Sequence, residues 1–557
     1  MNYFYPQDQQ NLFTDRETEL GQLKHALQSF KSGPAEHISL FGLRRVGKTL
    51  LLKELIRQVM ETEPDITPAY LDFSALCSSP ENFVLGYVGS ICYWLIEKGQ
   101  SDPELYFNAN TLPVTLARHG ADDLLEDIHP ILQELARAKP DRQALLRQAF
   151  RFPRQVVSKR KTRLSLVFDE FQEIQTLENF PESRNVLSLF RAEMQTQTGI
   201  VYFLAGSAIS ILSHLISHPD SPLFAQFTRL SVEPFPRAST RSLVEKLITE
   251  PLEEDLYPLI HSLTVGHPFY ITALSRRLSY LIEVVQRAAN QDTVKQAFLI
   301  ETLAPGGRIY DFCRYVYDLS LQKASGYGSL KAVLQILATD DGLTATQIAR
   351  RLRVTSATAS DYLRWLCEVD LIEVKDHIYT FRDPVLRFWV GNIVKGIELS
   401  LTAEPLDLKA LIARLDTQFQ KVSEELGSAQ ESLVRELMRS FKGQVVAGQW
   451  FGSEQPIRLP VFSEVNRYQT EDGQVELDAL ATPSSGQGWI TEVKWKNKRA
   501  GKKEITKLVE HAQDRKSQGW FISKAGFTSD ALFYAIEQGV YVSDEAGLQE
   551  LKKALAK

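Results

Sequence analysis

Cysteine is rare in this sequence, and the signals of secretion and membrane insertion are missing. The 557 residues include four cysteines, Cys77, Cys92, Cys313 and Cys367, without any C-x-x-C spacing. This argues against the usual cysteine patterns of zinc and dithiol sites and favours a reduced, cytoplasmic protein. No run of about eighteen apolar residues is present, which argues against a transmembrane helix. The N-terminal stretch has no basic region followed by an apolar one, so we expect no signal peptide.

A large excess of charge of one sign is also missing. The net charge is −6 and the pI is near 6.0, so any contact with nucleic acid has to come from a local patch. Hydrophobic residues make up 44% and charged residues 24%, which is ordinary for a folded protein. A chain of this length is too long to fold around one hydrophobic core, and we expect roughly three or four domains of about 150 residues each.

The strongest motif is GLRRVGKT at residues 42–49, which fits G-x-x-x-x-G-K-[ST]. It follows a strand-like apolar run, residues 38–41, and precedes a helical pattern, which is the context that a phosphate-binding loop requires. Backbone N–H groups of such a loop wrap a triphosphate, and glycine is needed where a Cβ atom would obstruct or where φ is positive. We therefore expect ATP here, with Lys48 reaching the β- and γ-phosphates and Thr49 ligating Mg²⁺. The expected nucleotide-binding residues of the loop are Gly42, Arg45, Val46, Gly47, Lys48, Thr49 and Leu50.

Two further apolar runs end in polar residues. Residues 164–168 lead into Asp169 and Glu170, a pattern typical of a buried parallel strand whose carboxyl end faces the nucleotide. We expect Asp169 to hold Mg²⁺ through water and Glu170 to act as the general base. Residues 200–205 lead to Ser207, which either lies beside the γ-phosphate or simply begins a turn.

Several other features allow two interpretations. Thr14 and Glu17 fit a capping box at the start of a helix. The basic run at residues 159–163 is either a solvated strand edge or a nucleic-acid contact. Arg229 is either a γ-phosphate or intersubunit arginine or a surface residue. His267, before Pro268, either caps a helix or projects onto the nucleotide.

The order of these segments resembles that of archaeal-type P-loop ATPases of the STAND/AAA+ lineage. The matching stretches are F-T-D-R-E-x-E-L, G-L-R-R-V-G-K-T, V-F-D-E-F-Q, L-A-G-S, S-P-L-F and V-G-H-P-F-Y, across residues 13 to 270. The resemblance implies a parallel-sheet ATPase core with a helical lid, and it places Arg16 near the adenine. Relatives often have Gly-Arg after S-P-L-[YF], whereas this chain has Ala225 and Gln226, which leaves the arginine finger unidentified.

Residues 342–381 have a winged-helix pattern. Thr344 and Gln347 form a capping box, residues 356–369 form a second helix, and residues 371–374 and 378–381 would pair as a wing. The second helix offers Arg364 but also Asp361 outward, so it is weakly basic. We therefore favour internal docking or protein contact over sequence-specific DNA reading.

The last 130 residues contain a second chemical constellation. Asp478 lies on one expected strand, and Glu492 and Lys494 share a face of the next. Two carboxylates can hold Mg²⁺ while an amine orients the attacking water, which is the chemistry of phosphodiester hydrolysis. The pattern resembles the PD-(D/E)xK nucleases, in which Glu431 would be the helical acid, although Leu477 replaces the usual Pro. A basic run at residues 496–507 is either a DNA-backbone contact or a solvated loop.

We therefore predict an α/β protein with five parts: a P-loop ATPase core at 1–235 with a helical insertion at 80–163, a helical lid at 236–325, a winged helix at 326–395, a helical connector at 396–425 and a restriction-endonuclease-like domain at 426–557. The predicted function is an ATPase that controls a Mg²⁺-dependent DNA nuclease, plausible in defence or mobile-element biology, with a nucleotide-dependent homo-oligomer as a candidate assembly. The alternative is a regulatory switch that binds DNA or protein without cutting.

Overall fold

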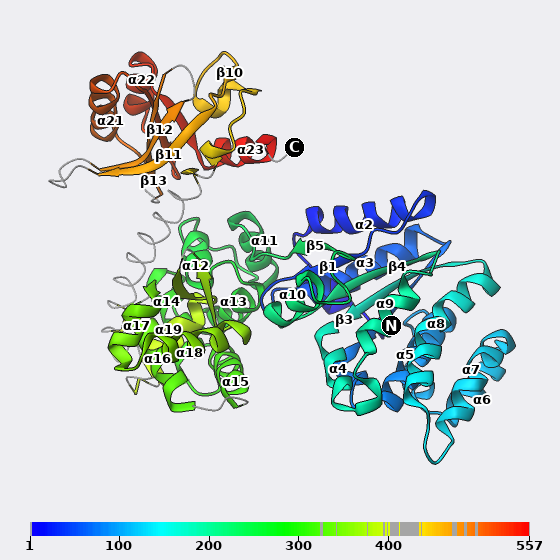
Figure 1. Ribbon diagram of the computed structural model, residues 1–557. Helices are drawn as coiled ribbons and strands as arrows, with labels where there is room; N and C mark the ends of the chain where they lie inside the picture. Colours follow the sequence, from blue (N-terminus) through cyan, green and yellow to red (C-terminus); the bar gives the residue numbers. More distant parts are fainter. Residues whose placement is uncertain are drawn as a thin grey trace. The chain divides into compact units, whose positions relative to one another are not determined.

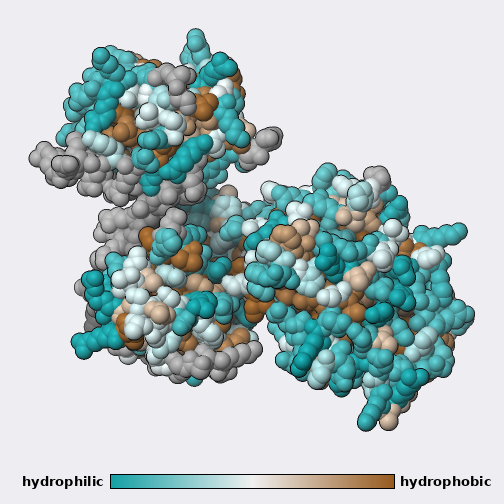
Figure 2. Space-filling model, viewed as in Figure 1, coloured by the Kyte–Doolittle hydropathy of each residue, from teal (hydrophilic) through white to brown (hydrophobic). Residues whose placement is uncertain are grey.

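The computed structural model describes residues 3–322, 327–340, 342–375, 377–393, 396–397, 399–400, 411–412, 434–435, 437–469, 476–483, 487–495 and 499–555. The chain forms two compact units, Met1–Leu408 and Lys409–Lys557. No helix among the described residues is long and apolar enough to cross a lipid bilayer. The face shown in Figure 2 is mainly hydrophilic, with small scattered hydrophobic patches.

The first unit is built on a five-stranded parallel sheet (Figure 1). Its strands are β1 (Ile38–Phe41), β2 (Ile66–Asp72), β3 (Arg163–Asp169), β4 (Ile200–Ala205) and β5 (Thr228–Ser231). The strand order is β2-β3-β4-β1-β5, so β4 lies between β3 and β1. All residues of β1 and β4 are buried, as expected of apolar runs in a sheet covered on both faces. This order brings the carboxyl ends of β1, β3 and β4 together.

The helices of this part of the chain cover both faces of the sheet or pack on other helices. They are α1 (Gln7–Leu12), α2 (Glu17–Ser32), α3 (Lys48–Thr62), α4 (Phe73–Leu76), α5 (Pro80–Ile96), η1 (Glu104–Tyr106), α6 (Thr111–Arg118), α7 (Asp122–Leu135), α8 (Arg142–Arg160), η2 (Phe171–Asn179), η3 (Pro181–Ser183), α9 (Val186–Met194) and α10 (Ile209–Ser217). Leu52, Ile56 and Val59 recur at helical spacing on α3 and are buried, so this face packs on the core. Figure 1 shows α2 on one side of the sheet and α5 and α8, from the helical insertion, on the other.

The capping box expected at Thr14 and Glu17 is wrong. Arg16 is the residue before α2 and has left-handed backbone angles, φ 80° and ψ 15°, without a side-chain cap. The Thr14 hydroxyl instead donates to the Leu12 carbonyl at 3.0 Å. The left-handed turn at Arg16 directs the chain so that a cap by Thr14 is not formed.

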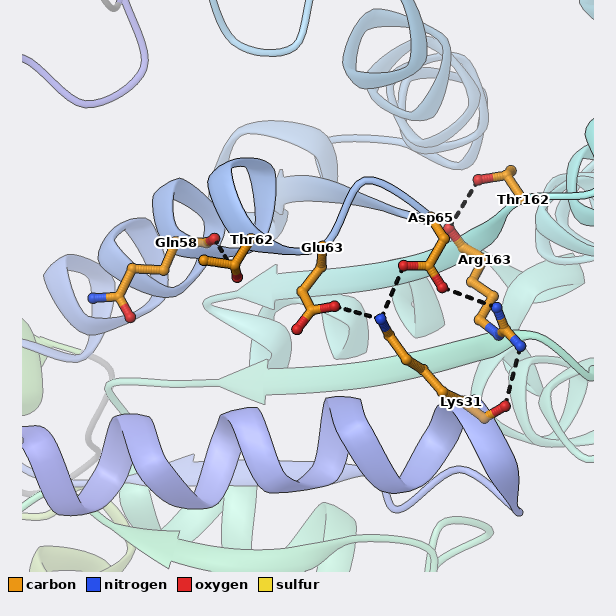
Figure 3. Close-up of polar contacts among 7 residues, drawn as sticks. All are labelled: Lys31, Gln58, Thr62, Glu63, Asp65, Thr162 and Arg163. Carbon is orange, nitrogen blue, oxygen red and sulfur yellow. Dashed lines mark hydrogen bonds and ion pairs between the residues drawn. The ribbon is translucent and has the colours of Figure 1, made fainter.

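Three of the four cations in the basic run at residues 159–163 form ion pairs with acidic residues of the first unit. Lys159 lies 2.8 Å from Asp127, and Arg160 lies 2.7 Å from Asp123. Figure 3 shows Arg163 and Lys31 sharing the carboxylate of Asp65, at 3.0 and 2.9 Å. Because these cations have intramolecular partners, the arrangement favours the structural interpretation of this run over nucleic-acid contact.

The lid and the winged helix complete the first unit. The lid consists of α11 (Arg237–Leu247), α12 (Leu256–Thr264), α13 (Pro268–Glu283), α14 (Gln291–Leu303) and α15 (Arg308–Gln322). The next elements are α16 (Tyr327–Thr339), β6 (Leu343–Thr344), α17 (Ala345–Leu352), α18 (Ser356–Glu368), β7 (Ile372–Lys375), β8 (Ile378–Phe381) and α19 (Pro384–Ile393). The sheet order is β6-β8-β7, and Thr344 and Gln347 form the predicted capping box.

The second unit is a five-stranded mixed sheet with helices on both faces. Its elements are β9 (Val445–Val446), η4 (Gly448–Phe451), β10 (Ile457–Arg458), β11 (Phe462–Gln469), β12 (Glu476–Pro483), β13 (Trp489–Lys494), α21 (Lys502–Asp514), β14 (Gln518–Ser523), α22 (Ser529–Glu537), β15 (Tyr541–Asp544) and α23 (Glu545–Leu555). The sheet order is β11-β12-β13-β14-β15, antiparallel up to β13 and parallel from β13 onward. The predicted mixed α/β fold class is therefore confirmed.

Candidate functional site

The phosphate loop joins β1 to α3 and depends on two glycines. Gly47 has φ 106°, a backbone conformation that other residues rarely adopt. At Gly42, a Cβ atom would lie 2.5 Å from the carbonyl oxygen of Val232. Glycine is therefore required at one position for its backbone angle and at the other for its lack of a side chain.

Lys48 is buried at the start of α3. Its Nζ donates hydrogen bonds to the carbonyl oxygens of Gly42, at 2.8 Å, and Leu43, at 2.9 Å. Burial lowers the pKa of Lys48 to about 8, although nearby Glu170 and Asp169 act in the opposite direction. The amine therefore lies inside the loop, within the field of both acids.

Thr49 and Asp169 meet at the end of β3. The Thr49 hydroxyl donates to Asp169 Oδ2 at 2.6 Å, and the Tyr70 hydroxyl donates to the same oxygen at 2.9 Å. Burial raises the pKa of Asp169. A hydroxyl and a carboxylate are oxygen ligands of the kind that Mg²⁺ prefers, so these two residues fit the ion. Tyr70 was not predicted as a site residue.

Glu170 is held on the other side of the loop. It has left-handed backbone angles, with φ 51°. Its Oε2 accepts hydrogen bonds from Ser207 N at 3.1 Å, Ser207 Oγ at 2.7 Å and Gln172 Nε2 at 2.5 Å. Burial raises the pKa of Glu170, but the hydrogen bonds from Gln172 and Ser207 outweigh this effect, and the net shift is downward. The carboxylate is thus kept ionised and oriented.

A cavity of about 500 Å³ adjoins the phosphate loop. Residues 45–50 of the loop, Glu170 and Ser207 line its polar part, and Phe13, Phe235 and Phe269 contribute apolar walls. This size is typical of small-molecule sites. The polar part suits phosphates and the apolar part suits a base.

Arg16 lines the same cavity but also contacts the phosphate loop. Its Nη2 donates to the carbonyl oxygen of Val46 at 3.0 Å, and its Nη1 lies 2.9 Å from Glu19 Oε1. The guanidinium lies 4.6 Å from the centre of the Phe235 ring. The resemblance that placed Arg16 near the base did not indicate this contact with the loop.

His267 and Arg229 differ in their relation to the cavity. His267 precedes α13 without making a side-chain cap, and its Nε2 lies 3.0 Å from the carbonyl oxygen of Arg44. Its side chain therefore reaches the loop backbone, which neither sequence interpretation included. Arg229 is exposed on β5 and lies over the Phe41 ring at 4.2 Å, which favours the interpretation as a surface residue beside a strand.

The winged helix contacts the ATPase-like core next to this site. Asp370, after α18, accepts hydrogen bonds from Ser210 N at 3.1 Å and Ser210 Oγ at 2.7 Å, in the first turn of α10. Arg382 lies 3.5 Å from Asp370. This is an internal docking contact of the predicted kind. The N-terminal turn of α18 is mostly exposed, so this contact does not occupy the end of α18 that reads DNA in helix-turn-helix proteins.

In the second unit, a β-bulge sets the position of Asp478. Asn466 pairs with Leu480, but Tyr468 pairs with Leu477, so β12 has one more residue than β11 in this interval. The backbone N–H of Val493 donates to Asp478 Oδ2 at 2.7 Å. Ala479 pairs with Thr491, and these two residues are the chain neighbours of Asp478 and Glu492 on the two strands. Two carboxylates therefore lie on adjacent strands.

The other predicted residues of this site differ in their surroundings. Lys494 forms an ion pair with Glu504, which caps α21. Arg435 Nη1 donates to the Asp478 carbonyl oxygen at 2.6 Å. Glu431 lies outside the described residues. Within the described part of the chain, no group of three or more His, Cys, Asp and Glu side chains is arranged to hold a metal. Among the described residues, the candidate residues of this site are Asp478, Glu492 and Lys494.

Two family models match the chain. Residues 460–552 match the model described as restriction endonuclease, and residues 329–373 match the winged helix-turn-helix DNA-binding model. The chain thus contains a winged helix and a C-terminal restriction-endonuclease-like domain. No curated protein sequence matches it significantly.

Several solved structures are similar to this chain over about two thirds of its length. The Walker-type ATPase PABY2304 of Pyrococcus abyssi is 16% identical over 68% of this chain and 96% of its own, with a TM-score of 0.48. The ORC2 protein of Aeropyrum pernix is 15% identical over 68% and 94%, with a TM-score of 0.43. RuvB of Thermotoga maritima is 14% identical over 68% and 95%, with a TM-score of 0.33. Similarity at this level assigns no activity to the chain.

Proposed function

We propose that the first unit binds and hydrolyses ATP. The proposal is carried by the hydroxyl of Thr49 lying 2.6 Å from Asp169 while Glu170 is held by Ser207 in the same cavity. Lys48 and the loop N–H groups bind the phosphates, and Thr49 and Asp169 would hold Mg²⁺, which would supply positive charge next to the phosphates. Glu170 orients the attacking water and accepts its proton.

Two substitutions separate binding from turnover. We expect Lys48→Ala to abolish nucleotide retention, and Glu170→Gln to retain ATP but slow hydrolysis by roughly 100-fold or more, because an amide cannot act as the base. Binding is measured with a fluorescent ATP analogue and turnover by phosphate release. Normal turnover by Lys48→Ala would contradict the site assignment.

We further propose that the second unit is a Mg²⁺-dependent DNA nuclease whose activity is controlled by the nucleotide state of the first. The restriction-endonuclease family match and the adjacency of Asp478 and Glu492 support it. These carboxylates would hold the ion, and Lys494 would orient the attacking water. We propose DNA as the partner because the winged-helix model is described as DNA-binding. We also propose a cytoplasmic location. We propose in addition that the protein forms a homo-oligomer when ATP is bound, and light scattering with and without ATP tests this assembly.

Cleavage is tested on supercoiled, linear and single-stranded DNA with Mg²⁺, with and without ATP. We expect Glu492→Ala, Lys494→Ala and removal of Mg²⁺ by EDTA to abolish cutting, while ATP hydrolysis by the two variants stays at the wild-type rate. Lys442→Ala, at an exposed position outside the basic run at residues 496–507, is the matched control. Equal cutting by the wild type and both site variants would contradict the nuclease assignment.

One observation favours a second function, a nucleotide-dependent switch that binds DNA without cutting it. The amine of Lys494 forms an ion pair with Glu504, which is not one of the two proposed Mg²⁺-binding carboxylates, Asp478 and Glu492. Tight DNA binding together with no cleavage in any divalent metal would support this function. Cleavage restored in Glu504→Gln would instead identify the ion pair as a restraint on an active nuclease.

A further inference from the structure

Two carbonyl oxygens of the phosphate loop are held by side chains from outside the loop. The Arg44 carbonyl is contacted by His267 Nε2 from the start of α13, and the Val46 carbonyl accepts a hydrogen bond from Arg16 before α2, both at 3.0 Å. Both side chains are buried, with 3% of His267 and 4% of Arg16 exposed. These contacts join the loop to two segments more than 200 residues apart in the sequence.

The carbonyl contacts determine where the next N–H groups point. In a planar trans peptide, the C=O of one residue and the N–H of the following residue point in opposite directions. Holding the carbonyls of Arg44 and Val46 therefore directs the N–H groups of Arg45 and Gly47 away from His267 and Arg16. Arg45 has φ 59° and Gly47 has φ 106°, and successive N–H groups in such alternating conformations form anion-binding concavities.

The conformation of Arg45 needs support from its surroundings. A residue other than glycine is strained at positive φ, and such strain persists only where neighbouring groups hold the backbone. The His267 contact fixes the peptide immediately before Arg45. The Arg45 guanidinium also lies over two adjacent rings from the lid, those of Phe269, at 4.5 Å, and Phe312, at 4.7 Å. The lid therefore holds this residue by both backbone and side chain.

Arg16 and His267 are also connected to each other. Phe235, whose ring lies under the Arg16 guanidinium, donates its N–H to the carbonyl of Gly266 at 2.7 Å. A Cβ atom at Gly266 would lie 2.1 Å from the carbonyl oxygen of Phe235, so the two segments approach closely only because residue 266 is glycine. The segment that carries His267 is therefore linked by a hydrogen bond to the residue that packs on Arg16.

The protonation of His267 is consistent with a donor role. Burial lowers the pKa of His267 to about 3, so the ring is neutral at physiological pH. Because a carbonyl oxygen only accepts hydrogen bonds, the single ring proton must be on Nε2. Within the described residues, the buried Nδ1 has no hydrogen-bond partner, which agrees with this tautomer.

We propose that Arg16 and His267 are positioning residues that orient the Arg45 and Gly47 N–H groups toward the nucleotide phosphates. This inference rests on the proposed ATP site. It assigns both residues to phosphate binding through the loop, independently of the base. Tripolyphosphate, which has no base or ribose, therefore distinguishes this role from contact with adenosine.

The test compares the full chain and its variants by calorimetric titration with ATP, ADP and tripolyphosphate, alongside the melting temperature without ligand. His267→Gln retains a donor of similar reach, whereas His267→Asn is too short. We expect His267→Asn to bind all three ligands about tenfold more weakly, and His267→Gln to recover most of this loss. His129→Asn, at an exposed position of the helical insertion, is the matched control.

The variant Arg16→Lys keeps the positive charge but loses the planar guanidinium that lies over the Phe235 ring. We expect Arg16→Lys to weaken all three ligands by about fivefold to tenfold. Wild-type affinity of Arg16→Lys and His267→Asn for tripolyphosphate would overturn the proposal, as would a loss confined to ATP and ADP. If wild-type protein binds none of the three ligands and Lys48→Ala behaves identically, the ATP site itself is wrong.

Discussion

Ser207→Ala offers a quantitative test of how the general base is held. Ser207 Oγ donates to Glu170 Oε2 at 2.7 Å, and the substitution removes this donor but keeps the backbone N–H at 3.1 Å. A hydrogen bond to a charged group contributes about 1.5–3 kcal/mol. If that energy orients the carboxylate in the transition state, kcat falls roughly 10- to 150-fold. The Kd for ATP should change less than about threefold, because this hydrogen bond orients the general base Glu170 and does not contact the nucleotide.

The pH profile provides a second readout of the same substitution. Hydrogen bonds from Ser207 help to lower the pKa of Glu170, so removing one raises it. The acidic limb of kcat should therefore move to higher pH, since the base becomes protonated sooner. Single-turnover ADP formation between pH 5 and 8 measures both effects, and Ser213→Ala, on the partly exposed side of α10, is the control. A rate within twofold of wild type and an unchanged profile would refute this account.

Three further outcomes are expected. Gly42→Ala should lower the free energy of unfolding by about 1–3 kcal/mol and weaken ATP binding, because its Cβ would lie 2.5 Å from a backbone carbonyl; urea denaturation and titration measure both. His267 has a lowered pKa of about 3, so the unfolded chain binds its proton first. The contribution of His267 to stability should be constant above about pH 6.5 and fall by up to about 1.4 kcal/mol per pH unit between about pH 6.5 and the folded pKa of about 3, and His267→Gln should remove that part of the slope in denaturation at pH 7 and 5. Asp370→Ala should destabilise the first unit by roughly 1–3 kcal/mol, since Ser210 loses a buried acceptor, and hydrogen exchange should increase in the first turn of α10.

Much of the fold follows from local patterns. Residues 38–41, 164–168 and 200–205 are predominantly apolar runs, each followed directly by glycine or aspartate, and all three form central parallel strands. Because parallel strands present their carboxyl ends on one edge, the sequence could predict that the phosphate loop, Asp169 and Ser207 share that edge. The strand order itself is a long-range property, and the insertion of β4 between β1 and β3 was not predictable from spacing.

The residues that sequence reasoning missed depend on register and on the lid. Tyr70 pairs with Val167, and this register brings its hydroxyl to Asp169. An aromatic residue in a strand gives no sign of such a contact, since most serve only as packing. His267 was identified as a candidate, but its partner is a backbone carbonyl. Backbone acceptors occur at every residue, so no motif could indicate that contact.

The bulge in β12 shows why a side-chain period of two residues was not enough to predict the face of the sheet on which each residue near Asp478 lies. Strict alternation puts Leu477 and Ala479 on the same face, yet Leu477 packs in the core beside α21, whereas Ala479 packs in the core on the opposite face of the sheet. The extra residue, at Asp478, changes the face of the sheet to which the side chains of β12 point. The Asp478 carboxylate accepts a hydrogen bond from the N–H of Val493. The position of the bulge is determined by the pairing of β12 with β11, which sequence spacing cannot reveal.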